Sequence, residues 1–183
     1  MKVLGISGSL RRHSHNRQLL LAAADLLPPG VAFELFEGLK DVPPFDEDDE
    51  GDPVPAGVAR LRAAIAGADT LLISTPEYNS SLPGQLKNAL DWASRPQATS
   101  VLMNKPVAVI GASTGAFGAV WAQAELRKVL AAAGARVLEG ELALGHAHER
   151  FDARGSLGED ALRGQLQDVV DALLEQARPR IAA

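Results

Sequence analysis

The segment GSLRRHSHN, residues 8–16, concentrates side chains that bind anions. It joins an apolar run to a helix-like run, and such a strand-to-helix turn presents free N–H groups and the positive end of a helix dipole. The segment therefore predicts a phosphate site, although neither the Walker pattern nor the dinucleotide-binding glycine pattern is present. A plain polar loop with a helix cap at Ser14 or Asn16 is the alternative. The candidate phosphate ligands are Ser9, Arg11, Ser14 and Asn16.

A second segment, TPEYNSSLPG at residues 75–84, has the features of a rigid ligand-binding turn. Two prolines stiffen it, and Gly84 lets a ligand approach the backbone closely. It holds the only tyrosine of the chain, whose ring suits a flat heteroaromatic ligand, while a buried turn with a structural tyrosine is the alternative. For Glu77 we expect a structural or backbone role, because the sequence shows no partner carboxylate. The candidate ring contacts are Pro76, Glu77, Tyr78 and Asn79.

A third segment, ASTGAFG at residues 112–118, is small and flexible. Backbone N–H groups at Ser113, Thr114 and Gly115 suit one edge of a ligand, and a helix start capped by serine or threonine is the alternative. The histidines do not indicate a metal site. His13 and His15 are expected to be exposed polar residues, and the histidines of the sequence HAH at residues 146–148 lack further ligands nearby.

The hydrophobic pattern predicts a scaffold that brings these three segments together. Short apolar runs without alternation are typical of strands buried on both faces of a parallel sheet, and helix-length segments separate them. This alternation predicts an α/β fold, a doubly wound parallel sheet with helices on both faces. The expected strands are residues 2–7, 31–37, 69–75, 105–113 and 135–144, the last being one strand or two; the expected helices are residues 16–27, 55–66, 83–93, a long helix ending near Gly134, and 159–177, closed by Pro179.

In such an open sheet, ligands bind beyond the carboxyl ends of the strands, at the point where the strand order reverses. The three segments follow the first, third and fourth expected strands, so we expect them to meet there. A phosphate on the first loop and a flat ring between the other two suit a five-stranded, flavodoxin-like sheet of order 2-1-3-4-5. Together these features indicate flavin mononucleotide, FMN, as the ligand.

The composition narrows the class of protein. The 183 residues, 46% of them hydrophobic, fit one globular domain over residues 1–183. The absence of cysteine excludes disulfides and thiolate chemistry and fits a reducing compartment, so we expect a cytoplasmic protein. A net charge of −5 argues against nucleic-acid binding, and no apolar run approaches the ~20 residues of a membrane span. The acidic run at residues 41–57 is expected to be a solvated loop.

Two motifs, GSLRRHSHN at residues 8–16 and TPEYNSSLPGQLKNALDW at residues 75–92, resemble the NADPH-dependent FMN reductase family of quinone, chromate and azo-dye reductases. The resemblance implies that the first motif holds the FMN phosphate and that residues 76–79 border the isoalloxazine ring, largely through backbone atoms. It places Ser113 and Gly115 at the pyrimidine edge of the ring. It also implies NADPH or NADH as electron donor, a small-molecule acceptor (a quinone, azo compound, chromate or free flavin), and a homodimer or homotetramer.

The same resemblance implies no obligatory catalytic side chain, because the cofactor carries the chemistry. No loop shows a pattern typical of a pocket for the 2′-phosphate of NADPH, so both nicotinamide donors are retained. Trp121 stands where many relatives carry an arginine, and the role of that arginine is not transferred. Two alternatives are a flavodoxin-type electron carrier without enzymatic activity and a flavin-free regulatory domain, with the acidic residues 45–52 as a partner contact.

Overall fold

A computed structural model describes residues 1–152 and 154–178 and contains one five-stranded sheet of order β2-β1-β3-β4-β5. Every neighbouring pair of strands is parallel, so the predicted flavodoxin-like α/β sheet is confirmed. Residues 135–144 form a single strand rather than two. The strands are β1 (Lys2–Ser7), β2 (Ala32–Phe36), β3 (Thr70–Thr75), β4 (Pro106–Ala112) and β5 (Arg136–Leu144).

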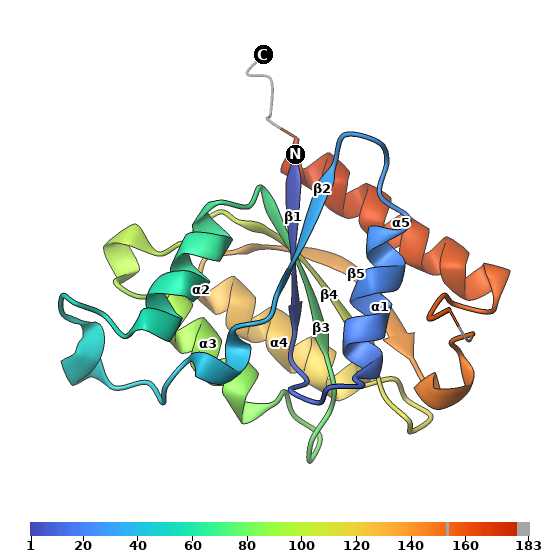
Figure 1. The fold of residues 1–183 in the computed structure, drawn as a ribbon, viewed down its shortest axis with the longest axis horizontal. Helices are drawn as coiled ribbons and strands as arrows, with labels where there is room; N and C mark the ends of the chain where they lie inside the picture. The colour runs from blue at the N-terminus through green and yellow to red at the C-terminus, as the bar shows by residue number, and fades with distance from the viewer. Residues whose placement is uncertain (153, 179–183) are drawn as a thin grey trace.

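Helices cover both faces of the sheet (Figure 1). The first and last helices pack on one face, and the three between them pack on the other. No helix in the described part of the chain is long and apolar enough to cross a membrane. The helices are α1 (His15–Ala24), α2 (Ala56–Ala66), α3 (Gly84–Ala93), α4 (Val120–Ala132) and α5 (Asp160–Ala177).

The central strands are rich in apolar residues because both of their faces are covered, and the polar residues of β3, Thr70, Ser74 and Thr75, are also buried. In β3, Leu71 and Ile73 join the core under α2, α3 and α4, whereas Leu72 between them joins the core under α1 and α5. Every residue of β3 and β4 is buried. This two-sided burial explains why these runs show no alternation of polar and apolar residues.

Two helix ends show how local chemistry stops a helix. The first helix ends at Ala24, three residues before the predicted end, and Leu26 and Leu27 then form tighter turns toward two prolines. The fourth helix ends as predicted: Gly134 has a φ of +85°, and the following N–H group donates to Leu130 O over 3.0 Å. Pro179, the expected end of the last helix, lies outside the described residues.

The acidic run at residues 41–57 is exposed in its middle but anchored at its sides. Residues 46–49 are exposed, as expected for a solvated loop. The Phe45 ring, however, meets the buried Trp92 ring edge-on, with centroids 4.9 Å apart, and the Phe45 N–H donates to Asn88 Oδ1 over 2.7 Å. The loop is therefore held against α3, on the same face of the sheet as α2 and α4.

Candidate functional site

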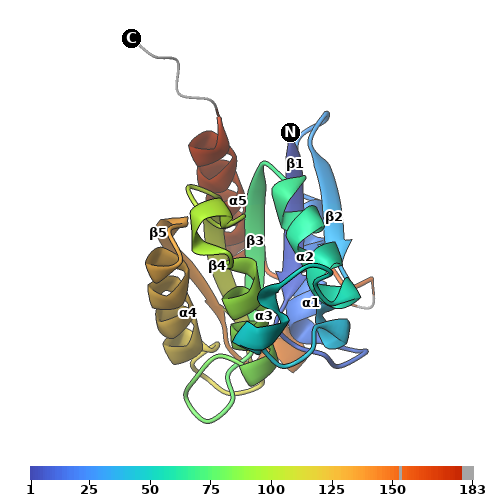
Figure 2. The same cartoon turned by 90° about the vertical axis from the view of Figure 1, so that its left-hand side faces the viewer.

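The loops that follow β1, β3 and β4 lie together at the carboxyl edge of the sheet, as Figure 2 shows. The first loop is joined to the end of β3, because the Gly8 N–H donates to Ser74 O over 2.8 Å. A Cβ atom at Gly8 would lie 2.9 Å from Leu86 Cδ2 and 3.3 Å from Pro76 Cδ, so this close approach favours glycine. The sequence segments that suggested ligand binding thus form one continuous edge.

The β1–α1 loop presents a row of free backbone donors. Among the described residues, no acceptor is present for the N–H groups of residues 10–16, which run into the first turn of α1. Ser14 caps this helix, because its Oγ accepts from the Arg17 N–H over 3.3 Å. The exposed Arg11 side chain lies over the loop and donates to His13 O over 3.1 Å. The loop therefore combines a helix cap with free donors of the kind that suit an anion.

Asn16 has a structural role that the sequence does not reveal. Its buried Oδ1 accepts from Ser74 Oγ over 2.7 Å and from the Ala112 N–H over 3.0 Å. Its Nδ2 donates to Ala112 O over 2.9 Å. The side chain joins α1 to β3 and β4. Only one Nδ2 hydrogen is left, so of the phosphate contacts expected for Asn16 its side chain can donate at most one hydrogen bond.

The β3–α3 loop forms a tight turn that exposes an aromatic ring. Tyr78 and Ser81 exchange backbone hydrogen bonds of 3.0 and 3.1 Å, and the two residues between them, Asn79 and Ser80, have φ values of +54° and +61°. The Tyr78 side chain is not a buried structural tyrosine, since half of the residue (50%) is exposed. Pro76 is buried at the base of the turn. The ring is therefore available to a ligand at the edge of the sheet.

Glu77 caps a helix that begins 43 residues later in the chain. Its Oε2 accepts from the N–H groups of Trp121 and Ala122, each over 3.1 Å, in the first turn of α4. Nearby, Ser81 Oγ donates to Glu125 Oε2 over 2.5 Å. This is the structural role expected for Glu77, and a contact between Glu77 and a ligand ring stays a prediction.

The β4–α4 loop is fastened to the segment that follows β5. Ser113 donates its N–H to Leu144 O and accepts from the Ala147 N–H, each over 3.0 Å. The Gly115 N–H donates to Ser113 Oγ over 3.1 Å, so it is already paired. In the described chain, the N–H groups of Thr114 and Ala116 have no acceptor. Ala119 occupies the N-cap position of α4 and makes no side-chain hydrogen bond there. The alternative of a serine or threonine cap is therefore wrong.

Sequence reasoning missed an exposed aromatic pair beside these loops. Phe117 and Trp121 are 66% and 49% exposed, and their rings meet edge-on with centroids 5.1 Å apart. The pair lies at the start of α4, where Glu77 accepts hydrogen bonds from the N–H groups of Trp121 and Ala122. A tryptophan in the first turn of an expected helix, four residues after a phenylalanine, is the sequence signal that could have marked it.

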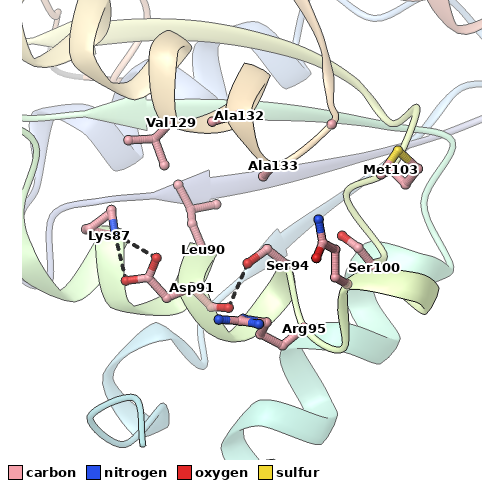
Figure 3. Close-up of a pocket in the computed structure, with 12 residues that line it drawn as sticks. Lys87, Leu90, Asp91, Ser94, Arg95, Ser100, Met103, Val129, Ala132 and Ala133 are labelled. Atoms are coloured by element: carbon pink, nitrogen blue, oxygen red, sulfur yellow. Dashed lines mark hydrogen bonds and ion pairs between the residues drawn. The ribbon is translucent and has the colours of Figure 1, made fainter. Parts of the chain in front are cut away.

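A separate cavity of about 430 Å³ lies between α3 and α4, toward the edge where the strands begin (Figure 3). Leu90 points toward Val129 across it, and Lys87 is paired with Asp91 over 2.6 and 2.8 Å. It contains none of the residues that the three loops contribute. Within the described ranges, no group of three or more His, Asp or Glu side chains is arranged to hold a metal ion.

Comparisons with known proteins agree with this architecture. A family model described as NADPH-dependent FMN reductase matches residues 1–149. An NAD(P)H-dependent FMN reductase of Pseudomonas aeruginosa is 44% identical, covering 94% of this chain and 93% of that protein. A 2-hydroxy-1,4-benzoquinone reductase of a Burkholderia species is 41% identical, with 98% of each chain covered.

Among solved structures, the flavoenzyme NAD(P)H:(acceptor) oxidoreductase FerB of Paracoccus denitrificans superposes with a TM-score of 0.88. It is 36% identical and covers 96% of each chain. The match therefore extends from sequence to the whole arrangement of strands and helices. The chain belongs to the NADPH-dependent FMN reductase family, and the expected FMN-dependent NAD(P)H oxidoreductase is confirmed.

Proposed function

We propose that the three loops hold FMN, with its phosphate at the β1–α1 loop. The observation that carries this proposal is the row of N–H groups at residues 10–16, which find no acceptor in the described chain and open onto the start of α1. Such donors at a helix N-terminus fit a phosphate group. Arg11 adds a charge-assisted donor, and Ser9 and Ser14 add hydroxyl groups. Asn16 contributes mainly by holding the loop in place.

The isoalloxazine ring lies between the other two loops in this proposal. Pro76, Glu77, Tyr78 and Asn79 border one side, and the half-exposed tyrosine ring is the available aromatic surface. At the pyrimidine edge, the loop of Ser113 and Gly115 offers free donors at Thr114 and Ala116, which suit the carbonyl oxygens of a flavin. The bound flavin supplies hydride acceptance and electron transfer, while these residues orient it and stabilise negative charge at that edge.

The substrates that we propose are NADPH or NADH as donor and a quinone-like small molecule as acceptor, with azo compounds, chromate and free flavin as further candidates. The quinone reductase of the Burkholderia species and the acceptor oxidoreductase of Paracoccus denitrificans support a small-molecule acceptor. The half-exposed ring of Tyr78 favours a flat aromatic acceptor, because aromatic faces stack. No side chain of the site needs to act as an acid or base in this proposal.

We also infer that the chain forms one FMN-binding domain over residues 1–183 and that it assembles as a homodimer or homotetramer in the cytoplasm. The exposed pair of Phe117 and Trp121 beside the flavin loops supports a second copy at this edge. The absence of cysteine suits a reducing compartment. Sedimentation of the flavin-loaded protein, compared with its Trp121→Lys variant, tests the assembly.

The experiment that tests the function is the visible spectrum of the purified protein before and after anaerobic addition of NADPH. We expect a flavin spectrum that bleaches rapidly and recovers when a benzoquinone is added. A flavin spectrum that NADPH bleaches poorly would instead indicate an electron carrier. A colourless protein that fails to take up added FMN would indicate a flavin-free domain.

A second experiment tests the phosphate site itself. Arg11→Ala together with Ser14→Ala should weaken FMN binding while the folded protein remains, although loss of the Ser14 cap itself costs about 1 kcal/mol of stability. Arg60→Ala is the matched control, because it removes an exposed arginine on α2 that pairs with Asp41 over 2.7 Å. FMN affinity that survives the double substitution unchanged would refute the phosphate assignment.

A further inference from the structure

The β4–α4 loop has two of its carbonyl groups turned toward one neighbour. Ser113 O and Gly115 O each accept a hydrogen bond of 3.0 Å from a backbone N–H group of the turn at residues 145–147. In a trans peptide unit, the C=O group and the N–H group of the next residue point in opposite directions. The N–H groups of Thr114 and Ala116 therefore both point away from that turn. Neither finds an acceptor in the described part of the chain.

Gly145 permits the close approach of the two segments. A Cβ atom at this position would lie 2.2 Å from Ala116 O and 2.8 Å from the Ala116 carbonyl carbon. Both are backbone atoms, so no rotation of a side chain can relieve the clash. A larger residue at position 145 would consequently displace the part of the loop that presents its free donors.

The buried side chain of Gln123 fixes the other end of the loop. Its Nε2 donates to Gly118 O over 3.1 Å, and its Oε1 accepts from Arg127 Nη2 over 3.4 Å, which sets the orientation of the amide. Gly118 and Ala119 have φ values of +57° and +64°. This left-handed conformation is unfavourable for alanine, so the surrounding contacts must hold it. The hydrogen bond from Gln123 is one of those contacts.

We propose that Gln123 and Gly145 are positioning residues for the bound flavin. They hold the β4–α4 loop so that the N–H groups of Thr114 and Ala116 face the carbonyl edge of the ring, and they thereby set the reduction potential of FMN. The inference rests on the proposed function, because it assumes that the ring lies at this loop. Both residues act through the backbone of the loop and do not contact the ring themselves.

The effect on the potential follows from the charge at the edge of the ring. Reduced FMN carries more negative charge there than oxidised FMN, and N–H donors bind a charged acceptor more strongly than a neutral one. Donors that are held in place therefore raise the potential, and donors that turn away lower it. A tenfold change in the ratio of the affinities for reduced and oxidised FMN shifts a two-electron potential by about 30 mV.

The test compares the midpoint potentials of the FMN-loaded variants Gln123→Met and Thr70→Val, measured by anaerobic equilibration with a reference dye. Methionine keeps the unbranched shape of glutamine without its donor. Thr70 is the matched control, because its buried Oγ1 donates to Pro106 O over 2.9 Å at the opposite edge of the sheet. We expect Gln123→Met to weaken the binding of reduced FMN about tenfold relative to oxidised FMN, which lowers the potential by about 30 mV. Thr70→Val should leave the potential unchanged.

Chemical denaturation of the FMN-free proteins separates positioning from stability. Both variants lose one buried hydrogen bond, so both should lose stability, and only Gln123→Met should change the potential. An unchanged potential in Gln123→Met, or an equal shift in the two variants, would overturn the proposal.

Gly145→Ala decides the question independently, including the case in which Gln123→Met does not fold. It should also lower the potential, whereas Gly140→Ala in β5, where a new Cβ would have no neighbour closer than 3.9 Å, should not. An unchanged potential in Gly145→Ala contradicts the positioning role. Failure of the proposed function would look different, because the unaltered protein would then take up no FMN.

Discussion

Replacing Asn16 by alanine tests how the flavin edge is held together. The substitution removes three buried hydrogen bonds, of 2.7, 2.9 and 3.0 Å, that join α1 to Ser74 and to the backbone of Ala112. Each bond is worth about 1 kcal/mol net, so the free energy of unfolding should fall by about 3 kcal/mol. For a chain of this size, that loss corresponds to a decrease in Tm of about 6–12 °C.

The measurement is chemical denaturation of the FMN-free protein, with FMN affinity measured separately under folding conditions. Ser74→Ala is the matched comparison, because it removes only one of the three bonds and should cost about 1 kcal/mol. The two substitutions share a hydrogen bond, so the double variant should lose less than the sum of the single ones. Unchanged stability of the FMN-free Asn16→Ala protein combined with weakened FMN binding would refute the structural role and restore a direct phosphate contact.

Two further substitutions test the loops that follow β3 and β4. Glu77→Ala should lower the free energy of unfolding of the FMN-free protein by about 1 kcal/mol, because α4 loses the acceptor for two N–H groups. Glu77→Gln keeps an acceptor oxygen and should lower it by less. Equal losses in the two variants would contradict the capping role. Gly118→Ala should destabilise by about 2–4 kcal/mol and disrupt the β4–α4 loop, since φ is +57° and the new Cβ would lie 2.3 Å from the Ala143 carbonyl carbon. Gly140→Ala is its control, with no neighbour closer than 3.9 Å, and comparable losses in thermal denaturation of the two variants would speak against this explanation.

The sequence predicts the scaffold well because its signals are local. Short apolar runs without alternation mark β3 and β4, and glycine or proline follows most helix ends. The ties within the site are not local. Asn16 meets Ala112 across 96 positions and Glu77 meets Trp121 across 44, and no periodicity encodes such contacts.

From these distant ties we expect the edge to bind a ligand with little rearrangement. Each of the three loops is fastened to another element: the first through Asn16, the second through Glu77, and the third through Ser113. A site held in this way loses little conformational entropy when a ligand binds. Substitutions at the ties should therefore weaken FMN binding through the stability of the FMN-free protein, whereas Arg11 should affect FMN affinity alone. Comparing the two quantities in each variant separates the residues that hold the site from those that touch its ligand.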